Sequence, residues 1–170
     1  MNDRFVQFYL GLAHHCSDMS RAVRLRVGCV IVNNDNVISH SWNGTPRGWD
    51  NTCEYQDRMP SDAGMLLPSE SIEQQWPLSD PMGRYRLVTK PEVLHAERNA
   101  LDKLSRNGTS GQGSTLFVTH APCVECAKSV YSVGIKEVYF SNYYRSNDGI
   151  EFLEKCGIPV KYVQYLRFNQ

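Results

Sequence analysis

The sequence lacks the features that would place the chain in a membrane or on a polynucleotide. Its 170 residues contain no run of about 18 apolar residues, so we expect no transmembrane helix and no membrane partner. Basic and acidic residues number 18 each, so no excess positive charge is available to hold a polynucleotide. A small anionic substrate is compatible with this balance. Internal repeats and low-complexity tracts are also missing, so we expect no repeat architecture.

Nothing near the first residue has the form of a secretion signal. Met1 to Arg4 lead straight into an amphipathic segment instead of an uninterrupted apolar stretch. The six cysteines could in principle pair, but without an export signal we expect reduced thiols or metal ligands. We therefore expect a cytoplasmic protein. The length and a hydrophobic fraction of 41%, with no break in composition, predict a single domain over residues 1–170.

Hydrophobic periodicity predicts helices alternating with strands. Residues 3 to about 19 have helical spacing, and two short apolar runs, 27–32 and 37–42, flank turn-forming residues as a hairpin. Further helices are expected over 95–107, 123–133 and 150–156, and further strands over 115–119, 137–140 and 160–164. This order predicts a three-layer α/β fold whose five-stranded mixed sheet is largely parallel and carries helices on both faces.

One long segment does not fit this alternation. Residues 57–91 show no clean period and contain five prolines. We expect an irregular insertion there, with at most short helical turns. A structureless segment of this length inside a domain usually indicates function, a partner surface or disorder.

Chemistry is concentrated in His95, Glu97 and the pair Cys123 and Cys126. One imidazole and a Cys-x-x-Cys pair supply three ligands of the kind zinc favours, which leaves a fourth position open as in catalytic sites. Both groups lie at predicted helix starts, where the helix dipole favours thiolates. A carboxylate at position 97 is suited to moving protons. The alternative is a structural zinc site or a chance cluster of thiols, but a structural site needs a fourth ligand and does not need Glu97.

This combination of His-x-Glu and Pro-Cys-x-x-Cys resembles the zinc-dependent cytidine/deoxycytidylate deaminase superfamily over most of the chain. The resemblance implies that superfamily's three-layer fold and a zinc ion held by His95, Cys123 and Cys126. It also implies that water attacks C4 of a pyrimidine. Glu97 would then protonate N3 and afterwards the departing amine, which leaves as ammonia.

Further segments resemble the deoxycytidylate deaminases in particular. They are residues 21–48 (RAVRLRVGCVIVNNDNVISHSWNGTPRG), residues 121–128 (APCVECAK) and residues 134–140 (GIKEVYF). The implied reaction is hydrolysis of dCMP to dUMP and ammonia. The implied substrate contacts are Asn43, Arg26, Ala96, Tyr143 and Tyr144. Asn43 offers both a donor and an acceptor, arginine suits a phosphate, and the tyrosines follow a strand at its carboxyl end. The alternatives are that Arg26 is a solvated charge and that Tyr143 is a surface aromatic.

Members of this family are typically hexamers activated by dCTP and inhibited by dTTP, each with Mg²⁺. The candidates for such a regulatory site are Arg24, Gly44, Thr45, Pro46, Arg47, Gly48 and Arg106. The two glycines let the backbone approach a ligand closely and offer N–H groups to phosphate. Arg106 has the simpler alternative of a charge at a helix C-terminus.

Some members of the family bind a second zinc ion through additional Cys and His residues. Here residues 57–91 contain neither, and Val23 stands where a cysteine would suit such a site, so we expect one zinc per subunit. Cys29 and Cys156 are interpreted as small core hydrophobes.

Four other functions remain open. A tRNA or polynucleotide deaminase on the same fold is disfavoured by the balanced charge. A nucleoside deaminase would not need the arginines before the hairpin. A riboflavin-pathway deaminase usually carries a reductase domain, for which this chain has no room. A non-catalytic nucleotide sensor would have no use for Glu97.

Overall fold

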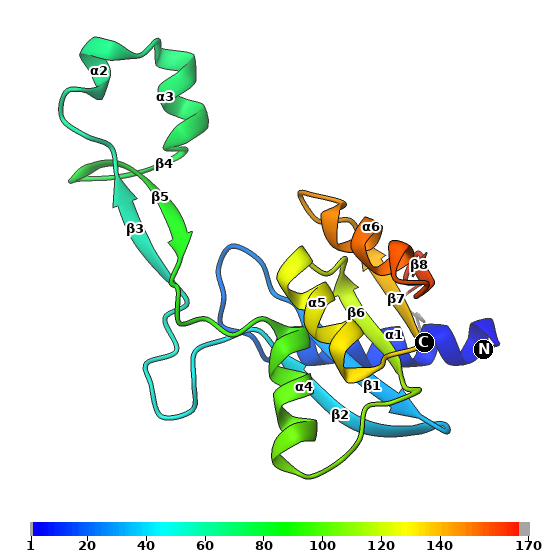
Figure 1. Ribbon diagram of the computed structural model, residues 1–170. Coiled ribbons are helices and arrows are strands. Elements are labelled where there is room, and N and C mark those ends of the chain that lie inside the picture. The colour runs from blue at the N-terminus through cyan, green and yellow to red at the C-terminus, as the bar shows by residue number, and fades with distance from the viewer. Residues whose placement is uncertain (1, 167–170) are drawn as a thin grey trace.

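The computed structural model describes residues 2–166, whose strands form one five-stranded sheet and one three-stranded sheet (Figure 1). The helices are α1 (Asp3–Asp18), α2 (Ala63–Leu66), α3 (Ser69–Gln75), α4 (Ala96–Arg106), α5 (Val124–Val133) and α6 (Asp148–Lys155). The strands are β1 (Gly28–Asn33), β2 (Asn36–Trp42), β3 (Glu54–Arg58), β4 (Leu78–Asp80), β5 (Gly83–Thr89), β6 (Thr115–His120), β7 (Glu137–Asn142) and β8 (Val160–Tyr162). No helix among these residues has both the length and the apolar character needed to cross a bilayer.

The larger sheet is mixed, as expected, with the strand order β2-β1-β6-β7-β8. Strands β6, β7 and β8 are parallel, whereas β1 is antiparallel to both β2 and β6. The prediction of a largely parallel sheet is therefore right only for the half after residue 115. The hairpin turn is made by Asn34 and Asp35, which both adopt positive φ, the conformation that two-residue hairpin turns require.

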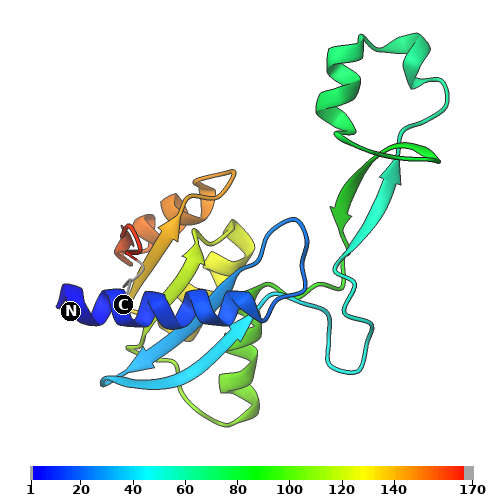
Figure 2. The same cartoon turned by 180° about the vertical axis from the view of Figure 1, so that it is seen from behind.

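Helices cover both faces of this sheet, as Figures 1 and 2 show. One face packs on α1 through residues such as Val30 and Phe117, and the other packs on α4, α5 and α6 through residues such as Ile31 and Val118. These neighbours alternate along β1 and β6 because successive side chains of a strand point to opposite faces. Cys29 is fully buried, as predicted, whereas Cys156 at the end of α6 is only partly buried.

The close approach of α1 to β1 depends on Gly28. A Cβ atom at this position would lie 1.9 Å from the carbonyl oxygen of Ala13 and 2.5 Å from the backbone nitrogen of Ser17. Because both atoms belong to a helix backbone, they cannot move aside as a flexible side chain could. The Gly28 amide also donates to Thr119 Oγ1, which ties the start of β1 to β6.

Residues Glu54–Thr89 form an arm that projects away from the body of the protein (Figures 1 and 2). Its strands form a small antiparallel sheet in the order β3-β5-β4, with α2 and α3 between β3 and β4. The predicted insertion over residues 57–91 is therefore present and contains two short helices, as expected, but the expectation that it is otherwise irregular is wrong because three strands form there. The prolines lie outside the strands, where they separate the elements instead of abolishing them.

The strands of the arm were not predicted because the arm has almost no hydrophobic core. No residue of β5 is buried, so the strand lacks the continuous apolar run that marks a core strand in a sequence. Ion pairs connect the elements of the arm instead: Arg58 with Asp80 at 2.7 Å, Arg84 with Glu73 at 2.8 Å and Arg86 with Asp57 at 2.6 Å. Such pairs are set by residues distant in sequence and leave no local periodic signal.

Candidate active site

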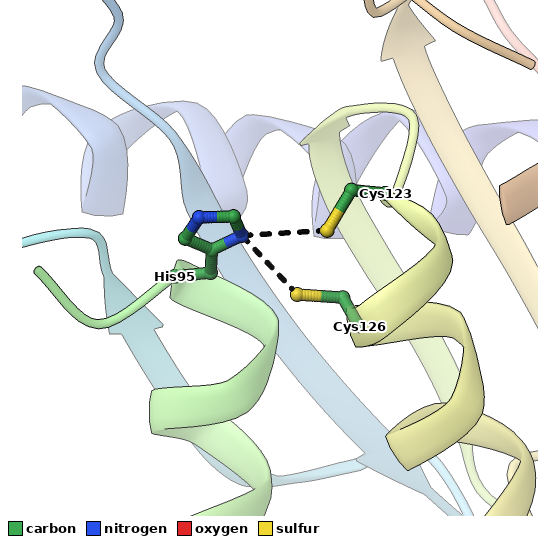
Figure 3. A group of neighbouring side chains, drawn as sticks. All are labelled: His95, Cys123 and Cys126. Carbon is green, nitrogen blue, oxygen red and sulfur yellow. Dashed lines mark hydrogen bonds between the residues drawn. The ribbon is translucent and has the colours of Figure 1, made fainter. Parts of the chain in front are cut away.

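Three potential metal ligands meet where two helices begin. His95 is the N-cap of α4, Cys123 is the N-cap of α5, and Cys126 lies on the first turn of α5. His95 Nδ1 lies 3.5 Å from the sulfur of Cys123 and 3.4 Å from that of Cys126 (Figure 3). All three ligand atoms lie within 4.8 Å of one another. The structure thus brings together the three residues that the sequence predicts.

These separations fit a tetrahedral zinc ion. Zinc–sulfur bonds of about 2.3 Å and zinc–nitrogen bonds of about 2.0–2.1 Å place the two kinds of ligand atom about 3.6 Å apart. Within residues 2–166, this is the group of His, Cys, Asp and Glu side chains whose spacing could hold a metal ion. The donor set of one nitrogen and two sulfurs leaves a tetrahedral ion with one position unfilled.

The electrostatics of the group also favour a cation. Hydrogen bonding from the Cys126 thiol and from His95 lowers the pKa of Cys123 to about 3. The same contact with Cys123, together with burial, raises the pKa of Cys126, and the Cys123 sulfur raises the pKa of His95. Without a cation, two thiolates cannot share so small a space, whereas a divalent ion would stabilise both.

Glu97 lies on the first turn of α4, two residues after His95. Its side chain is 4% exposed, and burial raises the pKa of Glu97 to about 7. A carboxyl group whose pKa lies near neutrality can both accept and donate a proton during one reaction cycle. Glu97 also faces the adjoining cavity, so a proton on it can reach a bound molecule.

That cavity has a volume of about 400 Å³, which lies within the range of small-molecule sites. Its lining includes His95, Glu97 and Cys123. The other lining residues are Arg24, Leu25, Val27, Asn43, Glu54, Thr89, Val93, Ala96, His120, Ala121, Tyr143, Tyr144 and Arg145. The cavity lining therefore combines two of the three potential metal ligands, the buried Glu97 carboxyl and two arginines.

Asn43, a predicted substrate contact, lines the cavity and also binds two backbone groups. Its Oδ1 accepts from the Val27 amide at 2.8 Å, and its Nδ2 donates to the Leu25 carbonyl at 2.9 Å. Its side chain therefore holds one wall of the cavity in place. Each group keeps further hydrogen-bonding capacity that a ligand could use.

The two arginines before the hairpin lie in the reverse of the arrangement expected from the sequence. Arg24, expected at a regulatory site, lines the cavity, whereas Arg26, expected at the substrate, does not. Arg26 instead donates through Nε to the carbonyl of Ala22 at 3.3 Å. The other expected substrate contacts, Ala96, Tyr143 and Tyr144, do line the cavity.

The expected regulatory residues do not gather into one place in the chain. Gly44 donates its amide to the Leu94 carbonyl and accepts from the Leu94 amide, so this N–H is committed and not open to phosphate. Thr45, Pro46, Arg47 and Gly48 lie outside the cavity lining. Arg106 ends α4, roughly 16 Å along the helix from His95.

The lining residues that were not predicted from the sequence include four with polar or charged side chains: Glu54, Thr89, His120 and Arg145. Glu54 and Thr89 belong to the arm, so no local motif connects them with the metal ligands. His120 ends β6 three residues before Cys123, and its place at the carboxyl end of a strand could have singled it out. Arg145 follows the predicted Tyr143 and Tyr144 and lies over the ring of Tyr144.

Comparisons with known proteins agree with this site. The sequence model described as "Cytidine and deoxycytidylate deaminase zinc-binding region" matches residues 3–142. The deoxycytidylate deaminase of Enterobacteria phage T4 is 30% identical over 95% of this chain and 91% of its own length. That of phage T2 is 32% identical over 94% of this chain and 93% of its own length.

A solved structure of a deaminase is also similar to this chain. The dCMP deaminase of cyanophage S-TIM5, crystallised in complex with dCMP and dUMP, superposes with a TM-score of 0.76. Its sequence is 34% identical, and the match covers 96% of this chain and 99% of that protein. Because this similarity is one of three-dimensional structure, it supports the fold independently of motif spacing.

Proposed function

The chain belongs to the cytidine and deoxycytidylate deaminases, and from this premise we propose that it hydrolyses dCMP to dUMP and ammonia. The observation that carries the proposal is the meeting of His95, Cys123 and Cys126, of which His95 and Cys123 line one cavity together with the buried carboxyl of Glu97. A structural metal site would not need that carboxyl, and a nucleotide sensor would not need its raised pKa.

The ligand group fits zinc in the chemistry of its donors and in their spacing. When bound to His95, Cys123 and Cys126, zinc supplies a Lewis acid that lets water act as a nucleophile near neutral pH. The start of α4 and the start of α5 direct their positive dipole ends toward the thiolates, which stabilises these ligands.

The protons are moved by Glu97. It takes a proton from the attacking water and gives it to N3 of the cytosine, and the oxygen forms a bond to C4. The second proton of that water passes through the same carboxyl to the amine. The C4–N bond then breaks and ammonia leaves, so one water is consumed for each ammonia formed. A pKa of about 7 suits both directions of transfer, and burial keeps the carboxyl from exchanging protons with bulk water.

The groups suited to hold the phosphate are two arginines in the cavity lining. Arg24 and Arg145 are the arginines in its lining, and a guanidinium can bind a phosphate through two parallel hydrogen bonds. Tyr143 and Tyr144 provide aromatic surface for the nucleoside. Tyr143 is 60% exposed, and its ring stacks on that of Tyr162 with 5.1 Å between the ring centroids, a contact that helps to hold it.

Regulation and assembly are proposed on the family's pattern. The enzyme would be a cytoplasmic hexamer, activated by dCTP and inhibited by dTTP, each with Mg²⁺. Arg47 and Gly48 are exposed and remain suited to a phosphate chain, with Arg106 supplied from a second subunit. The separation of these residues within one chain is what a regulatory site at a subunit interface would require.

The direct test is to follow the loss of the cytosine amine by ultraviolet absorbance with zinc-loaded protein. The substrates are dCMP, CMP and deoxycytidine, assayed side by side, and each reaction is repeated with dCTP and Mg²⁺. We expect the highest kcat/KM for dCMP. A higher kcat/KM for deoxycytidine would make the protein a nucleoside deaminase, and no turnover of any of the three would refute the proposal.

A further inference from the structure

The base of the arm forms part of the cavity wall. Glu54 is the first residue of β3 and Thr89 the last residue of β5, and they are opposite each other in the ladder of the arm. Both line the cavity. The arm therefore has a direct connection to the site, although most of it projects away from the body (Figures 1 and 2).

Glu54 is a buried carboxyl that binds backbone amides. It is 7% exposed, and its Oε1 accepts from the amides of Val23 and Arg24, at 3.1 Å each, while Oε2 accepts from Val23 at 3.2 Å. Hydrogen bonds to a charged acceptor are stronger than neutral ones. These contacts attach the loop between α1 and β1 to the arm.

The opposite side of the same loop is held by Asn43. Its side chain binds the backbone of Leu25 and Val27, and its carbonyl accepts from Ser20 Oγ at 2.8 Å. Arg24 thus lies in a stretch of backbone that is held on both sides. Such a loop presents its side chain from a defined direction.

The side chain of Arg24 is held as well. Its Nη1 donates to Thr89 Oγ1 at 3.2 Å. A guanidinium has five N–H donors, so this contact orients the group and leaves donors for a ligand in the cavity. Glu54 therefore holds the backbone of Arg24, and Thr89 holds its guanidinium group. Glu54 and Thr89 both belong to the arm.

We propose that Glu54 and Thr89 are positioning residues, through which the base of the arm directs Arg24 at the phosphate of the substrate. The arm then sets the affinity for a nucleoside monophosphate without touching the reacting atoms. This inference rests on the proposed function, because it takes the phosphate of dCMP as the group that Arg24 binds. A purely structural role would attach the arm to the body but would not separate KM from kcat.

The first experiment measures kcat and KM for dCMP and the dissociation constant of dUMP, by calorimetry, in zinc-loaded protein. Glu54→Ala should raise KM and weaken dUMP binding by about tenfold, the loss expected from one misplaced charged contact, while kcat stays within about twofold. Glu54→Gln keeps the size and one acceptor oxygen, so the loss should be smaller, about two- to fivefold. This variant keeps the test valid if the alanine variant folds poorly.

Asp57→Ala is the matched control. It removes a carboxylate from the same strand and breaks the ion pair with Arg86, but Asp57 does not line the cavity. Its KM and kcat for dCMP should match those of the unmodified protein. Equal effects of Asp57→Ala and Glu54→Ala would show that only the integrity of the arm matters and would overturn the inference.

Thr89→Val tests the contact at the tip of the arginine. It removes the hydroxyl at nearly constant volume and should raise KM about threefold. In an Arg24→Ala background the same substitution should have no further effect, because the group that Thr89 orients is gone. Additive effects of the two substitutions would contradict the inference.

A separate measurement distinguishes failure of this inference from failure of the proposed function. In nuclear magnetic resonance spectra, the amide protons of Val23 and Arg24 should be shifted downfield by the Glu54 carboxylate. They should return to ordinary positions in Glu54→Ala but not in Asp57→Ala. This result does not require turnover of dCMP. Unshifted amides would overturn the inference even in an active enzyme, whereas shifted amides in a protein that does not turn over dCMP would count against the proposed function alone.

Discussion

Replacing Glu97 by glutamine tests whether its carboxyl transfers protons without changing the structure of the site. The substitution keeps the size of a side chain that is 4% exposed, but removes its ability to transfer protons. It also removes the cost of holding a carboxylate in a buried position, the cost that raises the pKa of Glu97 to about 7. The folded state should therefore be as stable as that of the unmodified protein, or more stable.

The expected loss of activity follows from the role of the carboxyl. General acid–base catalysis by a positioned group contributes roughly 10²–10⁴-fold, and a pKa near the working pH places Glu97 where the contribution is large. Its removal should therefore raise the activation barrier by about 2.7–5.5 kcal/mol. Because Glu97 serves both N3 and the departing amine, the upper part of this range is expected.

The assay measures kcat with dCMP, zinc content after desalting, and the midpoint of thermal unfolding for Glu97→Gln and the unmodified protein in parallel. We expect one zinc per chain in both, an unfolding midpoint in the variant that is equal or higher, and kcat reduced by at least 10²-fold. Activity within tenfold of the unmodified protein would refute the role of Glu97. Loss of zinc would show that Glu97 supports the metal instead of the protons.

Three further predictions concern the ligands, the packing and the phosphate contact. Cys123→Ala should lose its zinc on desalting, measured by metal analysis; retention of a full equivalent would remove Cys123 from the ligand set. Gly28→Ala should destabilise the fold by about 1–3 kcal/mol in urea unfolding, because its Cβ would lie 1.9 Å from the Ala13 carbonyl; an unchanged unfolding midpoint would be inconsistent with that approach. Arg24→Ala should raise KM for dCMP about tenfold and Arg26→Ala less than twofold; the reverse order would restore the assignment made from the sequence.

The sheet could be predicted because its signals are local. Short β-branched runs, the turn at Asn34 and Asp35, and the glycine that ends α5 each act within a few residues. The site's metal ligands were predictable for a related reason. Zinc requires particular side chains at particular spacings, and helix starts hold them in place, so His95, Cys123 and Cys126 carry their own signature.

The arm and its contribution to the cavity were not predictable in the same way. Strands β3 and β5 pair residues about thirty positions apart without burying a hydrophobic face, so nothing local in the sequence predicts the ladder between Glu54 and Thr89. That Arg24 lines the cavity and Arg26 does not, contrary to the expectation, has a comparable cause. In an irregular loop, the side that each arginine faces depends on contacts from Glu54 and Asn43, which lie far along the chain.

The most direct test of the account is to identify the product formed from dCMP. Zinc-loaded protein and the zinc-free Cys123→Ala variant would be incubated with dCMP, and the nucleotides separated and identified by mass spectrometry while ammonia is measured. The account predicts dUMP and ammonia in equal amounts from the zinc-loaded protein and neither from the variant. Unchanged dCMP after incubation with a protein that carries one zinc per chain would contradict it.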